Sequence, residues 1–295
     1  MLSCDNDSND ILTNKNSFSK FIYCVGDSTT EGGSPGKSYP KYLQEIIGTN
    51  YQVFNEGHSG RESADLAVWT GGLTPVLKEN LTIPASGEVI ISKRPIDITI
   101  GKFRGFQVKG KLGNVKGTLK LADDEITFSF IREEIGDIVT LPAGTEFIAD
   151  GIKNLNDIVI WWTGQNDLAF GWPLNETAPR DCAIATFAKM PNANKRFLVI
   201  SVTNGTTYYK NDVNKQNALL KAEFPNNYID LQKIMIEDGL KMAGITPTTE
   251  DLQAIADERV PPSLLYDTVH PNDICKQKVI APTIYNELKK RNWIN

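Results

Sequence analysis

The sequence predicts an α/β protein with a mostly parallel, five-stranded sheet covered by helices on both faces, and with a small antiparallel β domain inserted into it. Two observations lead to this prediction. Apolar, β-rich runs alternate with helical patterns at both ends of the chain, as is typical of parallel sheets. The middle of the chain, from about Gly71 to Gly151, instead carries short alternating runs separated by Gly-, Pro- and Asp-rich turns.

The five runs expected to form the parallel sheet are short and rich in Val, Ile and aromatic residues, so they fit buried strands. They are "FIYCV" (21–25), "YQVF" (51–54), "DIVIWWT" (157–163), "RFLVISV" (196–202) and "NYIDL" (227–231). The helical patterns between and after them are "SYPKYLQEIIG", "RESADLAVWT", "DCAIATFAKM", "VNKQNALLKAEF" and "NDICKQKVIAPTIYNELKKRNW".

The inserted segment contains the alternating runs "EVIISK", "DITIGKF", "FQVKGKL", "GTLKLA", "EITFSFI" and "EFIAD". It lies between the second and third strands of the α/β part, so we expect an insertion rather than a terminal module. The predicted organisation is a disordered tail or tether over 1–17, an α/β domain formed by 18–70 and 152–295, and a β-rich domain over 71–151.

Composition excludes several functional classes. Hydrophobic residues make up 40% of the chain and charged residues 23%, which is ordinary for a globular protein. The formal net charge of −5 supplies no basic field for nucleic acid. None of the four cysteines, Cys4, Cys24, Cys182 and Cys275, forms a Cys-x-x-Cys pair, so neither a zinc site nor a redox motif is expected. We expect no metal and no organic cofactor.

The first 17 residues are polar and rich in Asn and Asp, and no apolar run reaches the length of a membrane span. One interpretation of Cys4 is the lipid-modified cysteine of a bacterial lipoprotein whose signal has been removed. The other is an unimportant cysteine in a frayed terminus. The lipoprotein interpretation implies a location at the bacterial cell envelope.

The stretch "FIYCVGDSTTEGGSPGKSYP" (21–40) allows two kinds of chemistry. Its "GKS" resembles the end of a phosphate-binding loop, but that loop needs Gly five positions before Gly36, where this chain has Glu31. A carboxylate there repels phosphate, so we interpret "GGSPGKS" as a flexible turn. Ser28 instead follows a buried strand directly, at the sheet edge where ligands of α/β proteins bind.

A serine nucleophile needs a base and oxyanion donors. Of the two histidines, His270 lies three residues after Asp267, and this spacing lets the carboxylate orient the imidazole. His58 is the alternative base, but Glu56 and Glu62 are its only carboxylates at comparable spacing.

Two further segments follow strands that should end at the same sheet edge as Ser28. "NEGHSG" (55–60) comes after the second strand and "GQND" (164–167) after the third. A backbone N–H at Gly60 allows close approach of a ligand, and the Asn166 amide adds a second donor. With the N–H of Ser28 they are expected to form an oxyanion hole.

The four segments "GDS", "NxGxSG", "GxND" and "DxxH", in this order, resemble the four blocks of the SGNH hydrolases, also called GDSL esterases and lipases. The resemblance implies a flavodoxin-like α/β/α sandwich. It also implies that Ser28 is the nucleophile, His270 the base and acid, and Asp267 the residue that orients the histidine. Gly60, Asn166 and the Ser28 amide are implied as the oxyanion donors.

Two departures from the family pattern are mild. Thr29 stands where Leu or Ile is common, and Gly60 and Asn166 are 106 positions apart, a gap that the β insertion explains. Among the tryptophans of this region, Trp162 and Trp172 are expected to stack on a sugar.

We therefore expect a serine esterase that removes acyl groups, above all acetyl, from a carbohydrate. The resemblance implies that the inserted β domain (71–151) binds the carbohydrate, as in family members that deacetylate polysaccharides or peptidoglycan. This is an argument by analogy, because a fold alone does not identify a substrate. The locations that we expect are the bacterial cell envelope, secretion, or a phage particle. The alternatives are a glycan-binding protein without catalysis and a small-ester lipase or thioesterase. The oligomeric state is not predicted.

Overall fold

A five-stranded, all-parallel sheet forms the centre of the protein, with strand order β12-β11-β10-β1-β2. The structure, a computed structural model, describes residues 20–96, 106–122, 124, 127–152, 157–171, 176–191, 194–206 and 210–295. The strands are β1 (Phe21–Gly26), β2 (Gln52–Gly57), β10 (Ile158–Trp162), β11 (Phe197–Ile200) and β12 (Tyr228–Ile229). This confirms the predicted α/β class and all five predicted strands.

Strand β1 lies in the middle of the sheet and pairs with both β2 and β10. In this register Gly26 is opposite Gly57 on β2 and Trp162 on β10. The three strands therefore end at one level, and the loops that follow them meet there.

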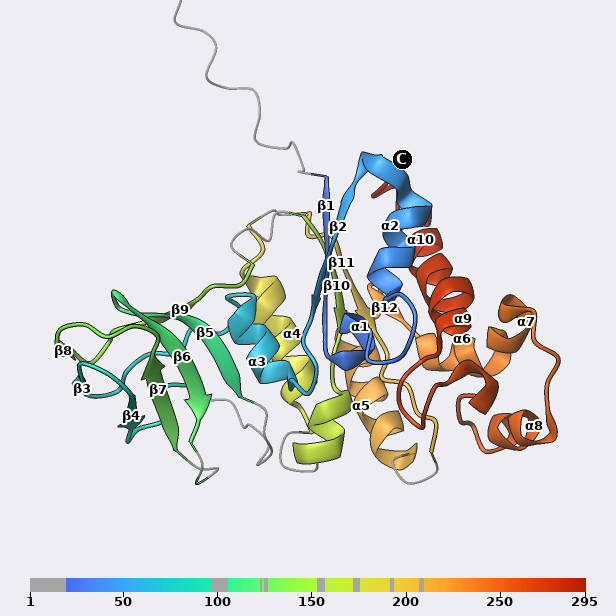
Figure 1. Ribbon diagram of the computed structural model, residues 1–295. Helices are drawn as coiled ribbons and strands as arrows, with labels where there is room; N and C mark the ends of the chain where they lie inside the picture. The colour runs from blue at the N-terminus through green and yellow to red at the C-terminus, as the bar shows by residue number, and fades with distance from the viewer. Residues whose placement is uncertain are drawn as a thin grey trace, which may run out of the picture.

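Helices cover both faces of the sheet (Figure 1). On one face the buried side chains come from α2 (Tyr39–Ile47), α6 (Leu231–Glu237), α7 (Gly239–Ala243), α8 (Thr249–Ala256) and α10 (Ala281–Lys290). On the other they come from α3 (Ser63–Trp69), α4 (Ala178–Ala188) and α5 (Lys210–Glu223). Successive side chains of a strand point to opposite faces, so Trp161 belongs to the second core and Trp162 to the first.

Short helical turns complete the α/β part. They are α1 (Ser28–Glu31), the 3₁₀ turns Gly48–Asn50 and Pro262–Leu264, a π-helical turn Asp167–Gly171, and α9 (Asp273–Cys275) with the π-helical turn Lys276–Ile280 that leads into α10. The predicted C-terminal helix thus consists of three joined segments. The sequence patterns did not predict α6, α7 and α8.

Two antiparallel sheets come from the middle of the chain. The larger has the order β4-β7-β6-β5-β9, and the smaller pairs β3 with β8. The strands are β3 (Leu81–Ile83), β4 (Glu88–Ile91), β5 (Gln107–Leu112), β6 (Val115–Leu121), β7 (Phe128–Arg132), β8 (Val139–Leu141) and β9 (Phe147–Ala149). Strands β3 and β8 were not predicted, and the whole run "DITIGKF" (97–103) lies outside the described residues.

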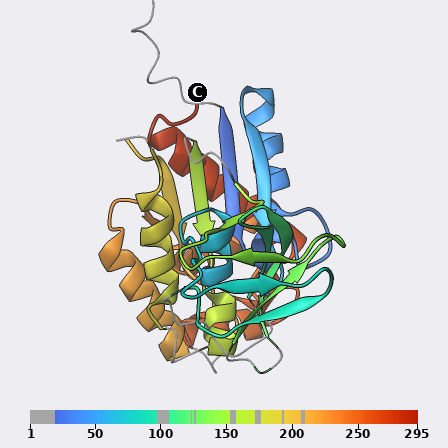
Figure 2. The ribbon, with the colours of Figure 1, turned by 90° about the vertical axis from the view of Figure 1, so that its left-hand side faces the viewer.

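The larger antiparallel sheet, called here the inserted sheet, packs against α3. Figures 1 and 2 show α3 and α4 between it and the parallel sheet. Buried residues of both regions, including Leu66 on α3, Phe128 on β7 and Trp161 on β10, belong to one continuous hydrophobic core. The backbone N–H of Gln107 on β5 also donates to the Asp65 carboxylate of α3 at 2.7 Å.

Candidate active site

Ser28 lies where β1 ends, as the first residue of α1. Asp27 caps this turn, because its Oδ1 accepts from the backbone N–H of Thr29 at 2.9 Å and from the Thr29 hydroxyl at 2.8 Å. A side chain at Gly26 would come within 2.5 Å of the Trp162 carbonyl oxygen, so only glycine fits the tight turn that places Ser28.

A chain of hydrogen bonds joins Ser28, His270 and Asp267. The Ser28 Oγ is 2.8 Å from the His270 Nε2, and the His270 Nδ1 is 2.8 Å from the Asp267 Oδ2. Ser28 and His270 are 242 positions apart, so the fold itself brings them together. A carboxylate that accepts from Nδ1–H leaves Nε2 free to accept the serine proton.

Asp267 is held as an anion by its surroundings. Burial by itself raises the pKa of this carboxyl, but hydrogen bonds from the backbone N–H of His270, from the imidazole and from the backbone N–H of Val269 outweigh it and lower the pKa below its usual value. The two backbone bonds are both 2.7 Å long. The tight turn from 267 to 270 therefore orients the carboxylate as well as the imidazole.

Gly60 and Asn166 lie on the loops after the two neighbouring strands. Gly60 is exposed and has a φ of +76°, a conformation that glycine adopts without strain. The Asn166 side chain donates from Nδ2 to the Arg61 carbonyl oxygen at 2.9 Å, which ties its amide to the residue after Gly60. An asparagine NH₂ has two N–H groups, so a second donor remains for another acceptor.

The buried carboxyl of Asp167, directly after Asn166, is hydrogen-bonded to Ser63 at the start of α3. Asp167 is fully buried, and its Oδ2 accepts from the Ser63 N–H at 3.0 Å and from the Ser63 hydroxyl at 2.9 Å. Burial raises the pKa of Asp167 to about 7, because the hydrogen bonds from Ser63 offset only part of the desolvation. The carboxyl of Asp27 nearby raises it further.

A second hydrogen-bonded cluster, called here the loop clasp, joins the segment after α1 to the segment that carries His270. The Ser34 hydroxyl donates to the Pro271 carbonyl at 2.6 Å. The Lys276 ammonium group donates to the Ser34 hydroxyl at 3.0 Å, and to the carbonyls of Pro35 at 3.1 Å and Ser34 at 3.3 Å. Lys276 is only 1% exposed.

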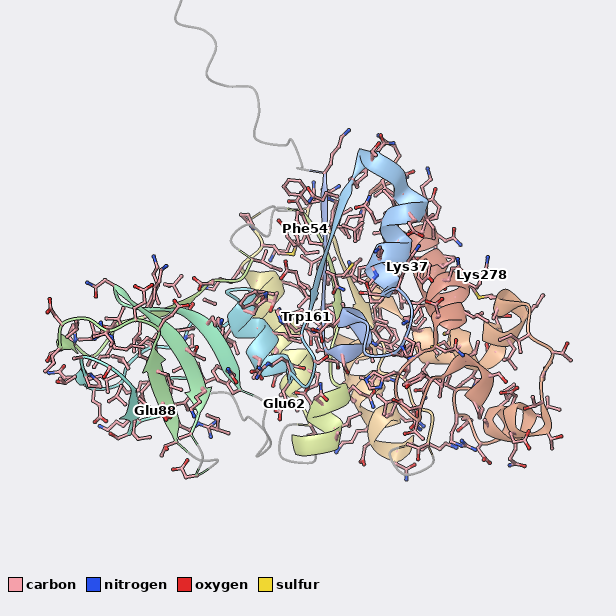
Figure 3. The ribbon with its side chains drawn as sticks, in the orientation of Figure 1. Lys37, Phe54, Glu62, Glu88, Trp161 and Lys278 are labelled. Atoms are coloured by element: carbon pink, nitrogen blue, oxygen red, sulfur yellow. The ribbon has the colours of Figure 1, made fainter. Side chains whose placement is uncertain are left out.

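The segment "GGSPGKS" lies between α1 and α2, as expected of a turn, and Asp273 also contacts it. The Asp273 Oδ1 accepts from the Lys37 N–H (3.0 Å) and from the Tyr42 hydroxyl (2.8 Å). Sequence reasoning overlooked Ser34 and Lys276. The one available signal was a lysine between the apolar positions of "ICKQKVI". The Lys37 side chain itself (labelled in Figure 3) is exposed and pairs with Glu45.

The remaining residues singled out from the sequence have other surroundings. The His58 ring packs edge-to-face on Trp69 at 4.8 Å, and Ser28 is bonded to His270. Trp162 is 3% exposed and packs on Tyr39, so it is a core residue and offers no surface for sugar stacking. Trp172 and the tail 1–17, with Cys4, lie outside the described residues.

Metal and membrane features can be assessed only where the structure is described. Within those ranges no group of three His, Cys, Asp or Glu side chains is arranged to hold a metal ion. No helix among them is both long and apolar enough to span a bilayer.

Comparison with solved structures supports the motif-based expectation for the fold. The acetyl xylan esterase AlAXEase is 15% identical and superposes with a TM-score of 0.50 over 91% of this chain and 99% of its own. The two proteins share their fold, as the resemblance to the SGNH hydrolases implies.

Two further solved structures are similar to this chain at lower TM-scores. A putative G-D-S-L lipolytic protein from Desulfitobacterium hafniense is 12% identical, with a TM-score of 0.45 over 92% of this chain and 98% of its own. An acetylxylan esterase from Geobacillus stearothermophilus is 13% identical, with a TM-score of 0.45 over 94% of this chain and 96% of its own.

Comparison of sequences adds one relative. The tail spike protein of Salmonella phage epsilon15 is 24% identical over 284 residues, which cover 85% of this chain. This chain spans only 25% of the length of that protein. No family model matches the sequence.

Proposed function

We propose that this protein is a serine esterase that removes acyl groups, chiefly acetyl, from a carbohydrate. The observation that carries the proposal is the hydrogen-bond chain from Ser28 through His270 to Asp267, with both contacts at 2.8 Å. This order supports the proposal, because acyl transfer requires a nucleophile bonded to a base and the base bonded to an orienting carboxylate.

In the proposed first half-reaction, the Ser28 Oγ attacks the ester carbonyl carbon while its proton passes to the His270 Nε2. The negative charge on the carbonyl oxygen is stabilised by the backbone N–H groups of Ser28 and Gly60 and by the Asn166 amide. The carbon–oxygen bond to the sugar then breaks, and His270 returns the proton to the departing alcohol. An acyl-serine remains.

In the second half-reaction, His270 takes a proton from water, and the resulting hydroxide attacks the acyl-serine. The tetrahedral intermediate collapses, the Ser28 Oγ leaves with the proton held by His270, and a carboxylic acid is released. Throughout, the Asp267 carboxylate accepts from Nδ1–H and stabilises the imidazolium. Every step uses side chains of this protein and water.

A carbohydrate substrate is favoured by what the similar proteins are called. One is named an acetyl xylan esterase, and the sequence relative is a phage tail spike protein. The name of the esterase supports an acylated polysaccharide as the substrate. The name of the sequence relative supports a phage particle as the location that we propose, and the lipoprotein interpretation of Cys4 supports the bacterial envelope as the alternative.

Hydrolysis of p-nitrophenyl acetate tests the chemistry, and acetate release from O-acetylated polysaccharides tests the substrate class. We expect the wild type to be active on both and Ser28→Ala to lose nearly all activity. Thr30→Ser, a change two residues away in the same turn, is the matched control. Equal rates for wild type and Ser28→Ala would contradict the serine mechanism, and inactivity of both would favour a glycan-binding protein. Faster hydrolysis of long-chain p-nitrophenyl esters would favour a lipase.

A further inference from the structure

A cavity of about 210 Å³ lies between α3 and β5, where the α/β part meets the inserted sheet. His58, Arg61, Asp65, Leu66, Trp69, Gln107, Val108 and Lys109 line it. Its volume is below the range usual for drug-sized ligands, so it suits a single small ring. Its lining combines apolar surface from Leu66, Trp69 and Val108 with five polar or charged side chains.

Two buried polar atoms of this lining lack a hydrogen-bond partner in the described part of the chain. They are the His58 Nε2 and the Asp65 Oδ2. Asp65 is 2% exposed, and its other oxygen already accepts from the Gln107 N–H at 2.7 Å and lies 3.8 Å from the Arg61 guanidinium. Buried polar atoms are nearly always hydrogen-bonded, so these two call for an internal water in the wall of the cavity.

The cavity shares one wall with the candidate active site. Its residues His58 and Arg61 belong to the loop that also carries Gly60. The His58 N–H donates to the Gly26 carbonyl at 2.9 Å, directly before the turn of Ser28, and the Arg61 carbonyl accepts from Asn166. A group bound in the cavity therefore lies one short loop away from the proposed oxyanion hole.

We propose that this cavity binds one pyranose ring of the glycan, next to the sugar whose ester Ser28 attacks. A pyranose has an apolar ring face for Trp69, and its hydroxyl groups can donate to the Gln107 amide oxygen and accept from the Gln107 and Lys109 side chains, which are exposed at the cavity. The position of the ring relative to Ser28 rests on the proposed function, whereas its binding does not. The inserted sheet then contributes specificity by supplying Gln107 and Lys109.

Direct binding can be followed by NMR through the Trp69 indole N–H resonance, assigned with Trp69→Phe. The probes are the methyl glycosides of xylose, glucose, galactose, mannose and rhamnose at millimolar concentrations. At least one should shift this resonance in the wild type, and the shift should be lost in the double variant Gln107→Ala/Lys109→Ala. Both side chains are exposed, so their truncation should leave the fold intact.

Lys111→Ala is the matched control, because Lys111 is exposed two residues further along β5 and outside the cavity lining. It should bind like the wild type. The absence of a shift with all five glycosides would overturn the proposal, as would an unchanged shift in the double variant.

Kinetics separate this proposal from the proposed function. On O-acetylated oligosaccharides the double variant should raise KM roughly tenfold, while its hydrolysis of p-nitrophenyl acetate should equal that of the wild type. Equal loss on both substrates would overturn the cavity as a sugar site. If the wild type hydrolyses neither ester, the proposed function fails, and the glycoside titration still decides whether the cavity binds sugar.

Discussion

The backbone of Gly33 lies directly against the imidazole of His270. A methyl group placed on Gly33 would be 2.9 Å from the His270 Cδ2, 3.0 Å from its Nε2 and 3.1 Å from the Ser28 Cβ. Contacts this short force a neighbour to move, and here both neighbours belong to the proposed catalytic pair. Because Gly33 has no side chain, it leaves room for the contact between Ser28 and His270.

Gly33→Ala should lower kcat about 10- to 100-fold, because small displacements of catalytic groups cost this much. Gly33 is exposed, so the melting temperature should change little. The measurement is kcat on p-nitrophenyl acetate together with a thermal melt. Full activity in Gly33→Ala would show that the imidazole tolerates displacement, against the geometry described here.

Lys276→Met should weaken the loop clasp. The substitution keeps the apolar stem but leaves three acceptors on Ser34 and Pro35 without their buried donor, which should cost about 2 kcal/mol of stability. We expect a lower kcat with little change in KM, since Ser34 no longer holds the segment of His270 rigidly.

Lys278→Met is the matched control for the loop clasp, because Lys278 is exposed two residues later in the same turn (Figure 3). It should match the wild type in kcat and melting temperature. If Lys276→Met lost stability but kept kcat, the loop clasp would serve folding alone.

Asp267→Asn should lower kcat on the order of 10²- to 10⁴-fold. The asparagine oxygen can still accept the backbone N–H groups of Val269 and His270, so the turn should persist. Its NH₂ group, however, cannot accept from Nδ1–H, and the imidazole would take the wrong tautomer. Steady-state kinetics on p-nitrophenyl acetate measures the loss, and a rate near that of the wild type would exclude Asp267 from the mechanism.

Asp167 should make the protein less stable as the pH rises. In the unfolded chain its carboxyl ionises near pH 4, whereas burial raises its pKa to about 7 in the folded state. The stability that it contributes is therefore complete below about pH 4 and is lost by about pH 7.

Asp167→Asn should remove this part of the pH dependence. Thermal melts of both proteins between about pH 5 and pH 8 measure it, and the melting temperature of the variant should fall less over this range. Parallel curves for the two proteins would mean that Asp167 is ionised in the folded state across the range.

Local sequence patterns predicted the parallel strands and the turns between them. Each central strand is a short apolar run with polar or glycine residues after it. This pattern can be recognised in the sequence without knowledge of the tertiary structure. The strands β3 and β8 were missed because each is three residues long and is followed directly by a proline, Pro84 or Pro142, which weakens a strand pattern. The helices α6 to α8 were missed because they follow one another in short pieces without a long apolar period.

By itself the sequence determined the α/β class, the five parallel strands, and the pairing of His270 with Asp267, because all of these depend on neighbours along the chain. Only the tertiary structure decided that Ser28 contacts His270, 242 positions away, that Trp162 is buried, and that Lys276 donates a hydrogen bond to Ser34. It also decided that a cavity forms between α3 and β5. The physical reason is that burial and contacts between distant segments come from the packing of strands, helices and loops, and no local pattern encodes which residues that packing brings together.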